Sequence, residues 1–210
     1  MVISSPAEYN TIITMLGCLC ATVQASTGIY AAVIKKKTSL IKTNDYLFRT
    51  HRAFGGFATT LYLLGLFAGI TGFISAITNP TGPVPYEPDM LSFAFHTWPS
   101  FPLAIIFILK TFISYFQKKK IYKIGKWLGI ATFFAWAYTW ITAAISYYVR
   151  TVPPYPEELQ HAPPEYLLPY NLMWLQLLIP FVIGGLIAIP IIKKAENQIK
   201  KKKKKRKTLE

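Results

Sequence analysis

The chain has 210 residues, of which 52% are hydrophobic and only 15% are charged, whereas a globular protein of this length carries about 25% charged residues. Its 23 Lys and Arg residues outweigh 9 Asp and Glu residues, for a net charge of +14, and the charges cluster between long apolar runs. This pattern excludes a basic soluble domain, and no soluble part remains to hold nucleic acid, so it predicts a polytopic membrane protein.

The apolar runs set the predicted fold. Each is long enough to cross a hydrocarbon core of ~30 Å as a helix that rises ~1.5 Å per residue. We expect five spans, at 10–34, 46–77, 90–117, 122–149 and 170–192. They predict an all-α integral membrane protein, a five-transmembrane-helix bundle in one domain over 1–195, followed by a lysine-rich tail over 196–210. The Pro-rich loops after the second and fourth spans cannot continue a helix, and we expect them to cap the bundle.

The first span is expected to be kept rather than cleaved as a signal peptide. The residues before it include Glu8 and no Lys or Arg, whereas a signal peptide begins with a positively charged region. Cys18 and Cys20 lie two residues apart in this span and would point to different faces of a helix. We therefore expect buried thiols rather than a disulfide or a metal-binding pair.

The basic residues predict the orientation. They gather at 35–42, at 118–123 and after 193, whereas the N-terminus and the other two loops hold a single basic residue, Arg150. Because cytoplasmic loops carry the excess of Lys and Arg, we expect a multi-pass protein of the cell membrane with its N-terminus outside and its C-terminus in the cytoplasm. The tail at 200–207 suits anionic lipid headgroups, although a solvated, disordered orientation signal is the simpler explanation.

In the second span, a histidine begins a face of small residues. Helical steps of three and four from His51 reach Gly55, Tyr62, Gly65 and Gly69. Such a face lets another surface approach the backbone closely. That surface is either a neighbouring helix, since Gly65 and Gly69 form a small-xxx-small pattern, or a flat cofactor such as a porphyrin. The fourth span has a similar small face and is a candidate for the partner helix.

Ionisable residues inside the spans are the next functional candidates. They are His51, Arg52, His96 and Lys110, and no Asp or Glu lies inside an expected span, which argues against an ion-coupled carrier. Arg52 and Lys110 are close enough to the cytoplasmic side to extend to water. The two histidines lie near opposite surfaces, roughly 15–20 Å apart along the normal, so they cannot ligate one iron. His161, in the fourth loop, can approach His96 if that loop folds inward.

Three segments carry a resemblance to known proteins. RTHRAFGGFATTLYLLGLFAGITGF, starting at Arg49, resembles the opening His-Arg helix of small membrane families related to the cytochrome b561-like group. The third span has a histidine near its outer start, in FHTWPSFPLAIIFILKTFIS, and the fourth ends in an aromatic, Thr-bearing stretch, KWLGIATFFAWAYTWITAAISYY. The resemblance covers roughly residues 49–148 and is one of pattern.

In such families, histidines on the spans hold b-type haem, which moves electrons across or along the membrane. Carried over by position, the resemblance implies a haem b site. Its cofactor-binding residues would be His51, His96, Gly55, Tyr62, Gly65 and Gly69, and its candidate iron ligands would be His51, His96 and His161. The chain departs from the pattern at the start of the fourth span, where Lys123 and Lys126 stand instead of a histidine. With 3 histidines in the chain, only one bis-His haem can form, between His96 and His161.

Two functions remain open. The first is a b-type-cytochrome-like electron-transfer protein or oxidoreductase subunit, with the glycine face seating the porphyrin. The second is a non-catalytic accessory or assembly subunit of a membrane protein complex, in which the glycine face packs helices and His51 and His96 make interhelical hydrogen bonds. A channel or transporter is weaker, because no span is broken by a mid-membrane Pro-Gly pair. Hydrolase and ATPase signatures are missing from the sequence.

Overall fold

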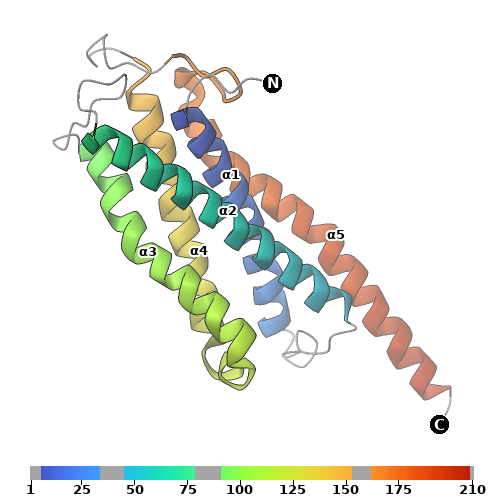
Figure 1. Ribbon diagram of the computed structural model, residues 1–210. Helices are drawn as coiled ribbons and strands as arrows, with labels where there is room; N and C mark the ends of the chain where they lie inside the picture. Colours follow the sequence, from blue (N-terminus) through green and yellow to red (C-terminus); the bar gives the residue numbers. More distant parts are fainter. Residues whose placement is uncertain (1–5, 34–44, 79–90, 153–161, 209–210) are drawn as a thin grey trace.

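The computed structural model describes residues 6–33, 45–78, 91–152 and 162–208, and these residues form long helices that alternate in direction (Figure 1). Five helices are long and apolar enough to cross a membrane, which confirms the all-helical, multi-pass architecture. The elements are α1 (Pro6–Val33), α2 (Tyr46–Thr78), α3 (Leu91–Phe116), α4 (Lys118–Val149), the short 3-10 turn η2 (Tyr170–Leu172) and α5 (Met173–Lys207).

Three helix boundaries differ from the expected spans by four residues or more. α1 begins at Pro6, because proline suits the first position of a helix, and the earlier start brings Glu8 into the helix. α4 begins at Lys118, so only Gln117 separates it from α3. α5 continues past the expected end at 192 to Lys207, because lysine is a good helix former and no Gly or Pro interrupts the stretch.

The first helix lies at the centre of the bundle. In its apolar window 44% of the residues are buried within the chain, against 17% for α2 and 11% for α3. α1 packs on α2, α4 and α5, whereas α3 packs mainly on α4. In Figure 1, α1 accordingly runs between α5 and the pair α2 and α4. The contacts of α1 therefore hold most of the bundle together.

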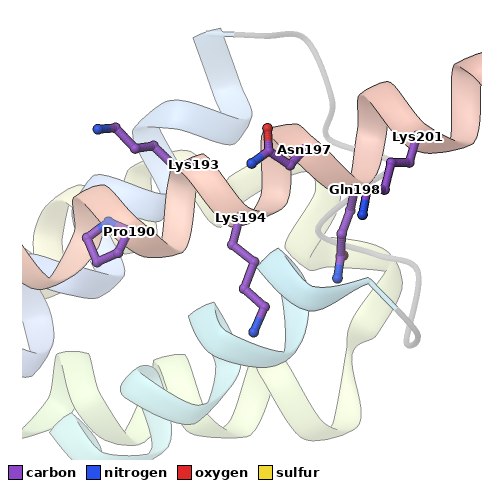
Figure 2. Close-up of a pocket in the computed structure, with 6 residues that line it drawn as sticks. All are labelled: Pro190, Lys193, Lys194, Asn197, Gln198 and Lys201. Atoms are coloured by element: carbon purple, nitrogen blue, oxygen red, sulfur yellow. The ribbon is translucent and has the colours of Figure 1, made fainter.

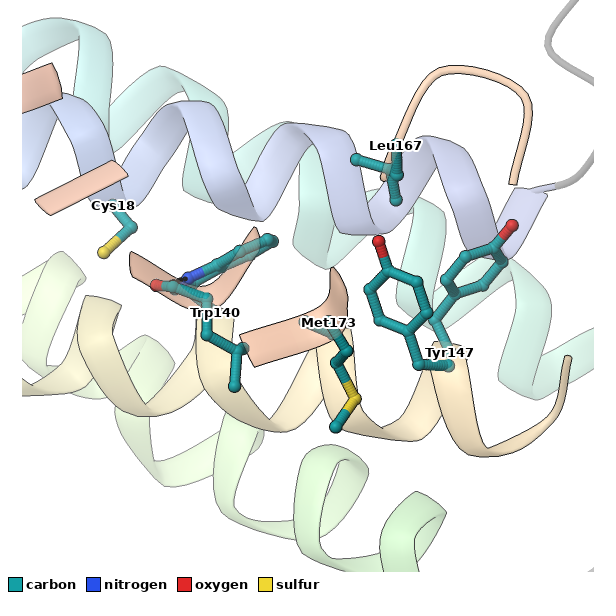
Figure 3. Packing of buried hydrophobic residues seen from close by; sticks show 8 residues of the cluster. Cys18, Trp140, Tyr147, Leu167 and Met173 are labelled. Atoms are coloured by element: carbon teal, nitrogen blue, oxygen red, sulfur yellow. Dashed lines mark hydrogen bonds between the residues drawn. The ribbon is translucent and has the colours of Figure 1, made fainter. Parts of the chain in front are cut away.

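The core consists of clusters that follow one another along α1. Near its start, Cys18 and Trp140 pack with residues that precede and begin α5, as Figure 3 shows. In the middle, Tyr62 and Trp136 belong to a second cluster, and a Cβ added to Gly17 would overlap the Trp136 ring. The third cluster, near the end of α1, consists of Val23, Ala31, Leu47, Ala188, Ile191 and Ala195.

The closest approach of α5 to α1 occurs at a glycine. A Cβ added to Gly184 would lie 2.8 Å from the Cβ of Thr22 and 2.9 Å from the backbone oxygen of Leu19. Backbone atoms cannot move aside as the end of a flexible side chain can. Gly184 therefore permits the crossing, as small residues commonly do where membrane helices meet.

This crossing generates a prediction with a neighbouring control. We expect Gly184→Ala to destabilise the bundle by about 1–3 kcal/mol, because the added methyl forces the two helices apart. Gly185→Ala should not destabilise it, since a Cβ there meets nothing within 4 Å and alanine favours a helix. Thermal unfolding in detergent, followed by circular dichroism, measures both. Equal midpoints for the two variants would contradict the close crossing.

Candidate functional site

The glycine face of α2 packs against α1 at Gly55 and Gly65, and not against α4, the candidate partner. A Cβ added to Gly55 would overlap the side-chain amide of Gln24, and one added to Gly65 would lie 3.4 Å from Oδ1 of Asn10. At Gly69, by contrast, an added Cβ meets nothing within 4 Å. The glycine face lies on α1 and not on α4 because of the order of the helices in the chain. Consecutive helices joined by a short connection usually pack as neighbours.

His51 is bonded to α1 near the end of that helix. Its Nδ1 lies 3.0 Å from Oγ1 of Thr27, and the Thr27 hydroxyl donates to the carbonyl of Val23 at 2.9 Å. The hydroxyl thus lies between its own helix and the His51 ring, and the contact joins α1 to α2 whichever ring nitrogen carries the proton. A Cβ added to Gly28 would lie 3.2 Å from Cε1 of the ring, so the ring rests on the α1 backbone.

Lys110 joins the same region from α3. Its Nζ donates to Oε1 of Gln24 at 2.8 Å, so it is bonded to the bundle rather than extended to water as expected. Gln24 thereby contacts α2 at Gly55 and α3 at Lys110. We call Gln24, Thr27, His51 and Lys110 the Thr27 cluster, and its members come from α1, α2 and α3.

His96 occupies a second polar cluster, near the start of α1. Its Nδ1 lies 3.1 Å from Oγ1 of Thr142, whose hydroxyl donates to the carbonyl of Tyr138 at 2.8 Å. Its Nε2 lies 3.5 Å from Nδ2 of Asn10, which is positioned to donate. Both ring nitrogens thus have a polar neighbour. The Asn10 cluster, comprising Asn10, His96 and Thr142, joins α1, α3 and α4.

The two clusters keep the histidines apart. Asn10 and Thr27, to which they bond, lie about 25 Å apart along α1 at ~1.5 Å per residue. His51 and His96 therefore do not meet, in agreement with the expectation that they cannot ligate one iron. The third candidate ligand, His161, lies outside the described residues.

The described residues do not fit a haem on the glycine face. Side chains of α1 occupy the space beside Gly55 and Gly65 that a porphyrin would need, and both nitrogens of His96 already have partners. Haem b stays a prediction that a spectrum can test.

Tyr62 is a core residue rather than the wall of a pocket. Its ring stacks on Phe107 with centroids 3.8 Å apart and meets Trp136 edge-on at 5.5 Å. Its hydroxyl donates to the carbonyl of Ser100 at 2.8 Å. Tyr62 therefore connects α2 to α3 and α4. Polar side chains with such interhelical bonds replace the water that a bilayer lacks.

The structural role of Glu8 was not predicted from the sequence. Glu8 precedes the expected first span, so it was not among the ionisable residues expected inside the spans. Glu8 is fully buried in the first turn of α1. Its Oε1 accepts the backbone N–H groups of Glu165 and Tyr166, each at 2.8 Å. Tyr148 adds a bond from its hydroxyl to the carbonyl of Leu168 at 2.6 Å. Residues 162–169 of the fourth loop are thus held against the bundle as the expected cap, whereas the second loop lies outside the described residues.

Comparisons with known proteins add no relative: no family model, curated protein or solved structure matches the chain. What the protein does has to be inferred from its own residues and contacts.

The Asn10 cluster predicts a structural coupling between α3 and α4. We expect His96→Ala and Thr142→Val each to lower the free energy of unfolding, and the double variant to lose about 0.5–2 kcal/mol less than the sum, as for other membrane hydrogen bonds. Chemical denaturation in micelles measures the cycle. Additive losses would show that the two side chains act independently.

The Glu8 cap predicts local protection of the loop. Glu8→Ala removes a charged acceptor of two N–H groups, and such bonds contribute about 1.5–3 kcal/mol each. Hydrogen exchange at residues 165–166 should therefore become at least about tenfold faster. Glu165→Ala is the matched control, because it removes an exposed carboxylate from the same loop but keeps the backbone N–H that Glu8 accepts. Equal acceleration in both variants would contradict this role of Glu8.

Proposed function

We propose that the protein is a non-catalytic accessory or assembly subunit of a membrane protein complex. One observation carries the proposal: the residues that suggest a cofactor site are used for contacts between helices. Gly55 and Gly65 admit α1 side chains, and His51 and His96 bond to Thr27, Asn10 and Thr142. Ionisable residues at membrane depth usually mark a site, but here their hydrogen bonds hold the bundle in one arrangement.

The outer surface of α2 and α3 supports a role in assembly. These two helices bury the smallest shares of their apolar windows inside the chain, 17% and 11%. Their outer faces carry large exposed aromatic side chains, including Phe57, Phe67, Trp98, Phe101 and Phe112. Such a surface suits the lipid bilayer and, through its aromatic side chains, a helix of another subunit. We place the protein in the cell membrane with its C-terminus in the cytoplasm, on the distribution of Lys and Arg.

A b-type-cytochrome-like electron-transfer protein is the second candidate, and one contact favours it. Nδ1 of His51 lies 3.0 Å from Oγ1 of Thr27, and in metal sites the second ring nitrogen of a ligating histidine is commonly fixed by such a bond. In that case His51 would present its other nitrogen to an iron, and the α1 side chains beside Gly55 would have to move.

The two candidate functions predict different visible spectra and different sizes of the native assembly. For the protein purified in mild detergent from haem-replete cells of its source, we expect no alpha band in the dithionite-reduced minus oxidised spectrum. We also expect it to run in native gels as part of an assembly larger than its own 23.8 kDa plus detergent. Gly184→Ala, which loosens the bundle, should reduce that assembly, and Gly185→Ala should not.

A sharp alpha band would overturn the proposal and establish a cytochrome if His51→Ala or His96→Ala abolished it while the protein remained helical. A colourless protein that runs alone under these conditions would overturn both candidates.

A further inference from the structure

The last helix is longer than a bilayer requires. α5 has 35 residues and therefore extends about 52 Å, whereas the hydrocarbon core is ~30 Å thick. In Figure 1 its C-terminal part projects past the ends of the other helices. The basic stretch begins at Lys193 and Lys194, directly after the apolar residues, where α5 still packs beside the end of α1 and the start of α2. These lysines are thus held on a helix at the level of a membrane surface.

A groove of about 510 Å³ runs along this part of α5. Its lining residues recur at helical spacing, so they form one stripe. They are Pro190, Lys193, Lys194, Asn197, Gln198 and Lys201 (Figure 2). All of these side chains are exposed. The stripe offers three ammonium groups and two amides, which are hydrogen-bond donors suited to phosphate oxygens.

No carboxylate competes within the groove. Between 190 and 208 the sequence has a single acidic residue, Glu196. That side chain belongs to another face, because its Oε1 accepts the hydroxyl of Tyr30 on α1 at 3.0 Å. Lys194 has a fixed place beside α2, with its Nζ over the ring of Tyr46, 4.6 Å from the centroid. The groove is therefore positively charged and partly preorganised.

We propose that this groove binds the phosphate headgroup of an anionic membrane phospholipid. A lipid fits better than a soluble anion because the groove opens directly onto the apolar surface of the span. Pro190 forms its apolar end, and the next turns of α5 expose Leu186 and Ile189. A headgroup between the lysines would thus have acyl chains alongside these two residues. The inference does not depend on the proposed subunit role, since it uses only the end of α5.

The test compares lipids that differ only in headgroup charge. The full-length protein in non-ionic micelles is titrated with short-chain phosphatidylglycerol and with phosphatidylcholine of the same chain length, and binding is followed by thermophoresis. Because each lysine near an anionic headgroup contributes about fivefold in affinity, phosphatidylglycerol should bind at least about tenfold more tightly. Inorganic phosphate is added as a competitor, because a site for free phosphate would be blocked by it.

Two variants that each remove three positive charges distinguish binding in the groove from attraction to the general positive charge of the protein. Lys193→Gln, Lys194→Gln and Lys201→Gln together should weaken phosphatidylglycerol binding at least about tenfold. Arg49→Gln, Lys126→Gln and Lys200→Gln together remove the same charge from exposed positions that do not line the groove, and should weaken it by no more than about twofold. Replacing the three groove lysines with arginine should preserve binding. That result would show that the triple Gln variant of the groove lost affinity because it lost charge and not because its fold changed.

Equal losses of phosphatidylglycerol affinity in the two triple Gln variants would overturn the proposed groove site and would indicate only diffuse electrostatic attraction. Equal binding of the two lipids, or displacement of the lipid by inorganic phosphate, would overturn the assignment to an anionic phospholipid. None of these outcomes bears on whether the protein belongs to a larger assembly, because native size and lipid binding are measured separately.

Discussion

In a bilayer, a polar side chain has to find its partner inside the protein, and in this chain α1 provides most of those partners. Its threonine hydroxyls, including those of Thr11 and Thr22, bond to carbonyls of their own helix, so they can be buried without a partner elsewhere. Its amides and the Thr27 hydroxyl serve other helices: Asn10 meets His96, Gln24 meets Lys110 and Thr27 meets His51. The surrounding helices are consequently arranged around α1, which is also the most buried of the five.

The polar contacts and the tight packing have different physical roles. A single interhelical hydrogen bond in a membrane is worth only about 0.6 kcal/mol on average, so the two histidines cannot supply most of the stability. The ring contacts of Tyr62 and Trp136 and the crossing at Gly184 bring far more atoms together. The hydrogen bonds instead fix the rotation of each helix, because a helix turned by one residue would move His51 or His96 away from its partner and leave a polar group in hydrocarbon.

Hydrophobic run length and helical period made the spans and the shared glycine face predictable, because both are local properties of the sequence. Periodicity says which residues share a face but not which helix covers it, and so the fourth span, and not the first, was the candidate partner of Gly55 and Gly65. The role of Glu8 depends on backbone N–H groups at 165 and 166, and no local signal connects positions so far apart. The length of α5 was predictable in principle, since lysine is a good helix former, but the change of hydropathy at 192 concealed it. The haem assignment, which rests on resemblance alone, stays a prediction.

The crossing of α5 over α1 also has a consequence for biosynthesis. α1 leaves the ribosome before α5, yet Gly184 and the residues around it form part of the surface that covers Thr22 and the backbone of Leu19. Gln176, near the start of α5, also donates to the sulfur of Met15 at 2.9 Å. Until α5 has been inserted, α1 must therefore wait in the membrane with one side uncovered, held by α2 and then α4. Closure of the bundle is consequently a late, post-insertion event, and a chain truncated before α5 would present that unfinished surface to the quality-control machinery of the cell.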